Sequence, residues 1–350
     1  MGISDSIYRE LKKRLEQGIY PAGSRFPSEA FLADEFGVNK MTMNKIVSVL
    51  AGENYLVRGV RGAGTRVAET NDLRPRGTIA FIAKLLPYET RILNGIIREC
   101  SRNNYSTVIE SPRSGDLQHR LQFLKNSGVT GVISAGYGVF EVPEGMIHFC
   151  LDYDPPQNAF PARTHFMNSD NFNGGIKLVN EVLRRGHREI LIFSSERFML
   201  SPTASVMPRV RGFNKALRQA GYTDIEERTF YGSSQSLADA AYFLETYLKR
   251  FPESTLILTD TDGSAELIHK AARNRGINCP GDIALTGFGN VTLLPIATVD
   301  QNPERQGELA ARYLMRFKEQ GEPEEPVKEY VETQLTGIED IPLNFKKDDQ

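Results

Sequence analysis

The sequence of 350 residues predicts two folded parts, a small α+β domain at the N-terminus and a larger α/β domain with parallel, doubly wound sheets. Residues 3–67 contain three short amphipathic segments, followed by two β-rich segments around a glycine-rich turn. From Gly77 onward, apolar β-rich runs alternate with amphipathic helical segments. A chain of this length also exceeds what one hydrophobic core usually supports, so we expect two or three domains.

Charge and cysteine content exclude several classes of protein. The 42 Lys and Arg residues nearly balance the 44 Asp and Glu residues, so only local basic surfaces are candidates for phosphate contact. Cys100, Cys150 and Cys279 lie far apart and form no CxxC pair, which argues against a zinc site and a disulfide framework. We therefore expect neither a metal nor a cofactor.

The distribution of apolar residues predicts no membrane segment. Charged residues interrupt the N-terminal segment, where a signal peptide would be apolar. No later stretch approaches the roughly 18 uncharged apolar residues that a transmembrane helix needs. We expect a cytoplasmic protein that does not associate with membranes.

Three helices are predicted at the N-terminus. Apolar residues recur every four positions over 3–15, which indicates an amphipathic helix. Ser28 is suited to cap a second helix that Gly37 ends, and Asn39 is suited to cap a third helix that ends at Gly52. The second and third helices are thus joined by a tight glycine turn.

Two short strands are predicted after the helices. Residues 54–58 and 65–67 are β-rich, and they flank a glycine-rich tip at 59–64. Helices followed by such a hairpin form a winged helix-turn-helix, so residues 1–68 are expected to be a DNA-binding domain. The polar segment 69–76 contains one proline and cannot bury an apolar face, which is typical of a linker.

The third helix is the expected recognition helix, because its first turns carry polar and cationic side chains that can reach phosphates and base edges. Its spacing predicts that Ile46, Val49 and Leu50 hold the helix to the core, while Lys40 and Asn44 face outward. The alternative interpretation is a small helical domain with ordinary solvated charges. The expected DNA-contacting residues are Arg25, Lys40, Met41, Thr42, Asn44, Lys45, Arg61 and Gly62.

This N-terminal stretch resembles the GntR-type winged helix along its whole length. The resemblance rests on the ordered motifs at 18–29, 32–38 and 62–67. It implies sequence-specific binding of double-stranded DNA. At 39–44 the chain has Asn-Lys-Met-Thr-Met-Asn in place of the family's common Ser-Arg-Thr-Thr-Val-Arg, and Ala30 stands where some relatives have an arginine. The operator of a relative is therefore not carried over to this chain.

The remaining chain alternates predicted strands and helices. The strand-like runs are 78–83, 106–110, 131–134, 146–151, 189–193, 255–259 and 283–287. The helical segments between them include 90–103, 170–185, 206–220 and 262–275. This pattern predicts parallel, doubly wound sheets, and its length favours two similar lobes joined by a hinge over one open sheet.

Several polar residues follow predicted strands or open predicted helices, where doubly wound sheets bind ligands. Asp152, Arg209, Thr261 and Asp262 carry the bidentate groups that recognise a polar small molecule such as a sugar. Taken singly, each has an ordinary alternative, because such an Asp often caps a helix and an Arg often pairs with a surface carboxylate.

Residues 77 to about 343 resemble the LacI-type sensor domain, which is itself similar to periplasmic sugar-binding proteins. The matching segments, in order, are 170–175, 185–190, 209–213, 262–265, 280–284, 287–288 and 298–301. The resemblance implies a two-lobed, periplasmic-binding-protein-like fold over 77–350 that binds an effector and forms a dimer. The effector-binding residues that it implies are Tyr88, Asp152, Arg209, Thr261 and Asp262.

The same resemblance implies that the chain crosses between the lobes near Asp170, Gln301 and Glu332, so that the lobes can hinge together. It implies a structural, not catalytic, role for His187. One departure is that Gly289 stands where many relatives have a sugar-binding aspartate, which points away from a familiar hexose or pentose.

A GntR-type reader joined to a LacI-type sensor is the arabinose-repressor-like arrangement. We expect a homodimeric repressor of carbohydrate-use genes that binds a near-palindromic operator and is relieved by a small, polar, sugar-like effector. The alternatives are a sugar-binding α/β enzyme and a repressor that acts without a ligand. The sequence contains no Gly-x-Ser-x-Gly elbow and no Walker loop, so we expect no enzyme activity.

Overall fold

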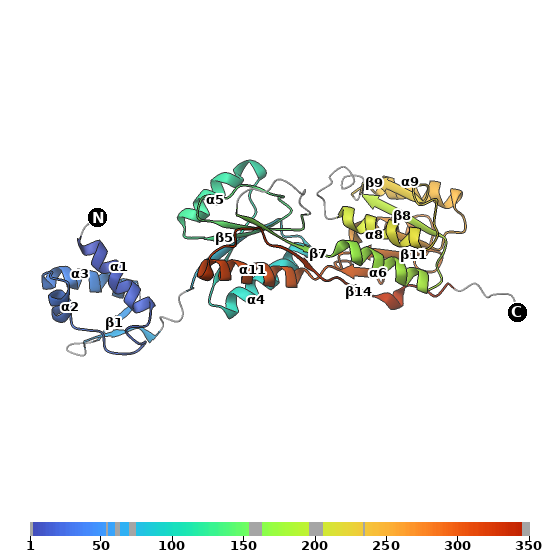
Figure 1. Cartoon of the computed structure of the whole chain (residues 1–350). Helices are drawn as coiled ribbons and strands as arrows, with labels where there is room; N and C mark the ends of the chain where they lie inside the picture. Colours follow the sequence, from blue (N-terminus) through green and yellow to red (C-terminus); the bar gives the residue numbers. More distant parts are fainter. Residues whose placement is uncertain are drawn as a thin grey trace. The chain divides into compact units, whose positions relative to one another are not determined.

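The computed structural model describes residues 3–53, 55–59, 64–69, 75–153, 163–195, 206–233 and 235–344. The chain divides into two compact units, Met1–Arg76 and Gly77–Gln350, which are described separately below (Figure 1). Residues 70–74 of the predicted linker and residues 60–63 of the predicted wing tip lie outside the described residues.

The first unit is a helix-turn-helix followed by a two-stranded antiparallel sheet. Its elements are α1 (Ile3–Glu16), α2 (Glu29–Glu35), α3 (Lys40–Gly52), β1 (Leu56–Arg58) and β2 (Thr65–Val67). Ser28 caps α2 by accepting a hydrogen bond from the Phe31 N–H at 3.2 Å. Asn39 caps α3 by accepting one from the Thr42 N–H at 2.8 Å. The capping residues expected from the sequence therefore begin both helices.

The prediction that Val49 packs into the core of this unit is wrong, because its side chain is 49% exposed. The buried face of α3 consists of Met43, Ile46, Val47 and Leu50. These residues follow the three- and four-residue spacing of one helix face, and Val49 lies off that face.

The second unit contains two lobes, each with a six-stranded sheet. In the first lobe the strand order is β13-β7-β6-β5-β3-β4, and all the neighbouring strands are parallel. The strands are β3 (Thr78–Ile82), β4 (Ser106–Glu110), β5 (Gly131–Ala135), β6 (Ile147–Leu151), β7 (Thr164–Ser169) and β13 (Lys328–Val331). The helices of this lobe are α4 (Pro87–Arg102), α5 (Leu117–Asn126) and α11 (Pro303–Gln320).

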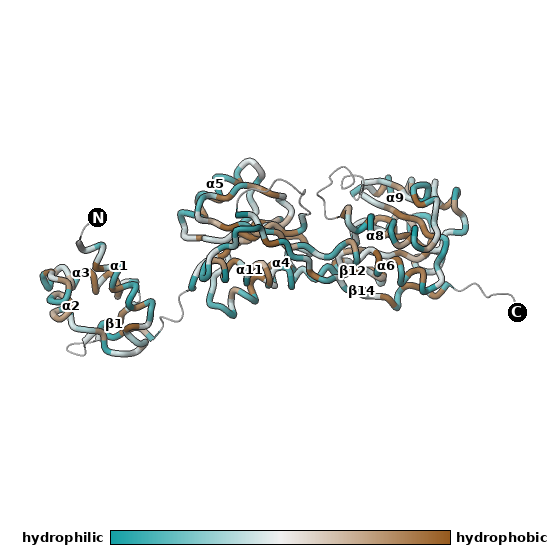
Figure 2. Tube along the Cα trace, viewed as in Figure 1, coloured by the Kyte–Doolittle hydropathy of each residue, from teal (hydrophilic) through white to brown (hydrophobic). Residues whose placement is uncertain are grey.

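The second lobe repeats this architecture, with the strand order β14-β12-β11-β10-β8-β9. Its strands are β8 (Ile190–Ser195), β9 (Thr229–Gly232), β10 (Leu256–Thr259), β11 (Ala284–Phe288), β12 (Ala297–Asp300) and β14 (Gln334–Thr336). Only β14 runs antiparallel to its neighbour, β12. The helices are α6 (Asn171–Arg184), α8 (Val206–Gln219), α9 (Leu237–Arg250) and α10 (Asp262–Arg273). The hydrophobic segments in Figure 2 coincide with the buried strands of both sheets.

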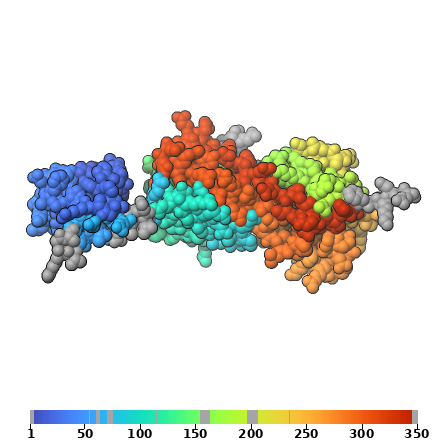
Figure 3. Space-filling view, turned by 90° about the horizontal axis from the view of Figure 1, so that it is seen from below, coloured from blue at the N-terminus to red at the C-terminus, as the bar shows by residue number. Residues whose placement is uncertain are grey.

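Three segments connect the lobes, after β7, after β12 and after β13. Figure 3 shows the orange and red C-terminal segments running from one lobe to the other. Hydrogen bonds tie these segments together: the Ser169 hydroxyl donates to the Gln301 carbonyl at 2.6 Å, and the Gln301 amide donates to Asn171 at 2.9 Å. All three side chains are buried. The hinge is thus a hydrogen-bonded bundle of crossing strands.

In the first lobe, α4 and α11 cross with their backbones in contact. Each helix has a glycine at the crossing, because a methyl group at Gly95 would overlap the Glu304 carbonyl oxygen and one at Gly307 would overlap the Ile92 carbonyl oxygen. Residues with a side chain at these positions would force the helices apart.

The second lobe has an equivalent crossing between α6 and α8. A methyl group at Gly175 would lie 2.5 Å from the Arg209 carbonyl oxygen, and one at Gly212 would overlap the Phe172 carbonyl oxygen. In each lobe, therefore, a helix that follows an interlobe segment is fixed against the helix beside it. None of the described helices is long and apolar enough to span a membrane.

We expect the substitution Gly175→Ala to destabilise the second unit by about 1–3 kcal/mol, because the added methyl group meets backbone that cannot move aside. The thermal unfolding transition of that unit measures the effect. Gly115→Ala is the matched control, since a methyl group there would meet no heavy atom within 4 Å. Equal melting temperatures for the two variants would contradict the close crossing.

Candidate functional site

The start of α3 presents the side chains expected to face DNA. Lys40 and Lys45 are exposed, and Met41 is 73% exposed. Thr42 and Asn44 are half-buried. An exposed methionine between two lysines can contact a thymine methyl group while the cations contact phosphates.

Asn44 is held inside the domain by a polar cluster that the sequence did not indicate. Its amide donates to both carboxylate oxygens of Glu29 at 3.0 Å, and Arg58 donates to the same carboxylate at 3.1 Å. Arg58 also donates to the Ser48 hydroxyl at 2.9 Å. The cluster joins α2, α3 and β1, so Asn44 positions the recognition helix, and its contact with a base stays a prediction.

Arg25 and Lys40 line one surface groove of about 570 Å³, between the foot of α2, the start of α3 and the start of β2. Arg25 lies against the wing, because a Cβ on Gly64 would be 3.2 Å from its Nε atom. Two predicted residues of the wing tip, Arg61 and Gly62, lie outside the described residues. The groove places two cations between the recognition helix and the wing, where a phosphate backbone fits.

We expect Lys40→Ala to weaken binding to operator and to unrelated DNA alike, because a phosphate contact carries no sequence information. The slope of log affinity against log salt should fall by about one. Fluorescence anisotropy across a salt series measures both quantities. Lys13→Ala, the same change on an exposed lysine of α1, is the control and should leave the slope unaltered. An unchanged slope for Lys40→Ala would contradict the assignment of Lys40 to the DNA interface.

The five residues predicted to bind an effector line one cavity of about 300 Å³. They are Tyr88, Asp152, Arg209, Thr261 and Asp262. Tyr88 and Asp152 come from the first lobe, and the other three come from the second. We call this cavity the interlobe pocket. A ligand in it contacts both lobes at once.

Arg209 lies on α8 and forms the wall of the interlobe pocket together with Phe288. Its guanidinium group is 4.5 Å from the centre of the Phe288 ring, and Nη1 donates to the Asp260 carbonyl at 2.9 Å. The side chain is 5% exposed, and its buried Nε atom has no partner among the described residues. A buried donor without an acceptor is costly, so this group is suited to a ligand oxygen.

Behind this wall, Asp260 fixes the ends of the central strands. Its carboxylate accepts hydrogen bonds from the Ser194 hydroxyl at 2.9 Å, the Ser195 N–H at 2.6 Å and the Ser264 hydroxyl at 3.1 Å. Complete burial raises the pKa of Asp260, although these donors oppose the shift. Asp260 therefore holds β8, β10 and α10 in register beneath the pocket.

Asp262 lines the interlobe pocket, but both of its carboxylate oxygens are already engaged. Oδ2 accepts from the N–H groups of Val291 at 2.6 Å and Thr292 at 3.2 Å, and Oδ1 accepts from the Thr298 hydroxyl at 2.7 Å. These bonds fix the loop that follows β11. With these bonds, Asp262 shapes the pocket wall. Its direct contact with an effector stays a prediction.

Thr261 caps α10 at the mouth of the interlobe pocket. Its hydroxyl accepts from the Ser264 N–H at 3.0 Å. Gly289 also lines the pocket, with φ of 132°, and Asn290 beside it turns its amide to Asp300 at 2.7 Å. Asn290 does not line the pocket and so does not replace the carboxylate that Gly289 lacks.

The first lobe contributes Tyr88, Glu89 and Asp152 to the interlobe pocket. The Tyr88 hydroxyl accepts from Gln306 at 2.9 Å, and burial, together with the charge of Asp152, raises the pKa of Tyr88. Asp152 has a φ of 56° at the end of β6, and its carboxylate has no hydrogen bond or ion pair among the described residues. It is available to a ligand.

Glu89 is a pocket residue that the sequence analysis missed. Its Oε2 atom is buried and has no partner among the described residues. Burial raises the pKa of Glu89, and the charge of Asp152 adds to the shift. The signal that would have found it is Pro87, which begins α4 three residues earlier than the predicted start at Thr90 and brings Glu89 into the first turn.

A network around Arg91 connects the lobes beside the pocket. Arg91 on α4 donates to Asp300 at 2.9 Å, to Glu304 at 2.8 Å and to the Asn290 carbonyl at 3.2 Å. Asn290 belongs to the loop that Asp262 fixes. The first lobe is thus bonded to a loop of the second lobe that lines the interlobe pocket.

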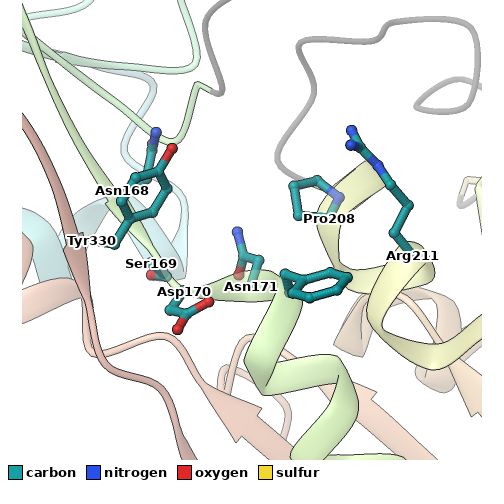
Figure 4. Close-up of a pocket in the computed structure, with 8 residues that line it drawn as sticks. Asn168, Ser169, Asp170, Asn171, Pro208, Arg211 and Tyr330 are labelled. Atoms are coloured by element: carbon teal, nitrogen blue, oxygen red, sulfur yellow. The ribbon is translucent and has the colours of Figure 1, made fainter. Parts of the chain in front are cut away.

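A second cavity of about 270 Å³ lies at the hinge, next to the start of α6. Figure 4 shows Asn168 and Tyr330 on one side, Pro208 and Arg211 on the other, and Asn171 between them.

His187 is buried in the second lobe, where its ring nitrogens contact the Thr255 hydroxyl and the Pro342 carbonyl at 2.9 Å each. Among the described residues, no group of His, Cys, Asp and Glu is arranged to hold a metal ion.

Comparison with known proteins shows a DNA-binding transcriptional regulator with a sensor domain. Residues 3–67 match the model of the bacterial regulatory proteins of the gntR family. Residues 179–336 match that of the periplasmic binding protein-like domain. The chain therefore carries a GntR-type DNA-binding domain joined to a periplasmic-binding-protein-like sensor.

Several proteins of known role are similar to this chain in sequence or in fold. The HTH-type transcriptional regulator CelR of Thermobifida fusca is 24% identical over 336 residues, which cover 89% of this chain and 97% of the relative. The arabinose metabolism transcriptional repressor of Geobacillus stearothermophilus is 22% identical and covers 90% of each chain. A solved complex of the transcriptional regulator CelR with cellobiose aligns with a TM-score of 0.61 at 20% identity, over 89% of this chain and 98% of the other.

Proposed function

We propose that this chain represses carbohydrate-use genes and that a sugar-like effector in the interlobe pocket relieves the repression. The composition of that pocket carries the proposal: polar atoms of Asp152 and Arg209 that have no partner among the described residues lie on opposite lobes, and the Phe288 ring forms part of the wall. Sugars are bound by such combinations of bidentate polar groups and aromatic rings. A relative named for arabinose metabolism and a related structure with bound cellobiose support the same ligand class.

The proposed mechanism is closure of the two lobes around the effector. Because the pocket residues are divided between the lobes, a bound ligand stabilises one interlobe angle at the expense of others. We propose that the chain acts in the cytoplasm as a homodimer through residues 77–350. Two recognition helices then contact half-sites about one DNA turn apart in a near-palindromic operator.

Repression is relieved only if the effector binds the DNA-incompetent arrangement more tightly than the DNA-bound one. Linkage then requires DNA to weaken effector binding by the same factor. The linker over 69–76 joins the sensor to residues 1–68 and transmits the change. The GntR-type reader and the sensor are both needed for this response.

We expect Arg209→Ala to abolish effector-induced release of DNA while leaving DNA affinity unchanged. Loss of a charged hydrogen-bond donor from a buried site costs about 1.5–3 kcal/mol, or roughly 10- to 150-fold in effector affinity. The measurement is anisotropy of labelled operator titrated with the carbohydrate that most raises the melting temperature of the wild-type protein.

Arg218→Ala is the matched control, because Arg218 is an exposed arginine on the same helix that lines neither the interlobe pocket nor the hinge cavity. It should respond to effector as the wild-type protein does. Normal induction of Arg209→Ala, or weakened DNA binding without loss of induction, would contradict the assignment.

A further inference from the structure

The free polar atoms of the interlobe pocket are unevenly distributed between the lobes. On the first lobe, Glu89 Oε2 and the Asp152 carboxylate are acceptors without hydrogen-bond partners among the described residues. On the second lobe, Arg209 Nε is a donor without a partner. The carboxylate of Asp262 does not enter this comparison, because both of its oxygens are satisfied by the protein.

The pocket also carries an excess of negative charge. Its described lining includes the carboxylates of Glu89, Asp152 and Asp262 against the single guanidinium group of Arg209. Negative charges that lack a counter-ion are costly to bury. Burial, and to a lesser extent the charge of Asp152, raises the pKa of Glu89, so a cation bound beside it would favour the ionised carboxylate.

A neutral sugar satisfies only part of this pocket. Each hydroxyl donates one hydrogen bond, which fills an acceptor but leaves the excess charge in place. An ammonium group carries three donors and a positive charge, so it can bond to two carboxylates and neutralise one. The cavity of about 300 Å³ corresponds to about ten water molecules, which is the size of a small polar molecule and not of a polymer.

We propose that the effector is a cationic polyol, of the amino-sugar class, whose ammonium group binds between Glu89 and Asp152 of the first lobe. Its hydroxyl and ring oxygens accept hydrogen bonds from Arg209, and its apolar face packs on Phe288. The inference rests on the proposed function and adds the charge of the ligand to it.

Calorimetric titration of the full-length protein with matched sugars tests the proposal. The pairs are D-glucosamine with D-glucose and D-galactosamine with D-galactose, at a pH where the amines are protonated. The amine of at least one pair should bind tenfold or more tightly than its neutral partner. N-acetyl-D-glucosamine, which has the bulk but not the charge, should lose that advantage.

Two variants locate the cation. Glu89→Gln and Asp152→Asn should each remove most of the preference for the amine over its neutral partner, because each replaces a carboxylate by a neutral amide of the same size. Glutamine keeps the ability of residue 89 to accept at the start of α4, so the fold should survive. Glu144→Gln, on an exposed residue of the first lobe, is the control that should keep the preference.

The possible results separate the two proposals. Neutral sugars binding as tightly as the amines would overturn the cationic effector and leave the proposed function standing. A preference that persists in both variants would also overturn it, because the cation would then lie elsewhere. Failure of every sugar, charged or neutral, to bind would contradict the proposed function as well.

Discussion

Contact between backbones at two helix crossings determines where the pocket residues lie. At the crossing of α6 and α8, the Arg209 carbonyl packs against Gly175, so the turn that carries Arg209 is fixed by a helix that begins at the hinge. At the crossing of α4 and α11, Gly95 and Gly307 allow the two backbones to touch, which fixes the position of α4, the helix that carries Glu89. Because packed helices resist separation, movement at the hinge carries the pocket residues with it as rigid groups.

Hydrogen bonds continue this connection across the lobes. Asp262 holds the loop after β11, and the Asn290 carbonyl in that loop accepts a hydrogen bond from Arg91 of the first lobe. Arg91 also pairs with Asp300, where the chain leaves the second lobe. A ligand that bridges the lobes therefore acts on groups that hydrogen bonds already couple to one another. This is the physical basis for a discrete change of interlobe angle upon binding.

The sequence predicted the fold class well because its signals are local. Hydrophobic runs such as 131–134 and 255–259 coincide closely with buried strands, and Ser28 and Asn39 cap the helices they were expected to cap. Short or amphipathic elements such as β9 and β14 were missed, because their few residues give no strong alternation. Glu89 was missed because α4 begins at Pro87 and not at Thr90, the predicted start.

The details of the candidate sites depend on tertiary contacts that no local pattern reveals. Asn44 looks like a free base-reading amide in the sequence, yet in the fold its amide donates to Glu29, whose carboxylate also accepts from Arg58. Asp262 looks like a free ligand group, yet three hydrogen bonds occupy it. The positions of pocket residues were predictable by resemblance, whereas the availability of their polar atoms required the structure.

Regulation by the proposed mechanism requires the effector and DNA to favour different arrangements of one molecule. The most direct measurement is calorimetric titration of the effector into the protein, alone and with a saturating duplex that the protein has selected from random DNA. We expect DNA to weaken effector binding about 5- to 150-fold, the usual range of coupling between two sites. Equal effector affinity with and without DNA would contradict it.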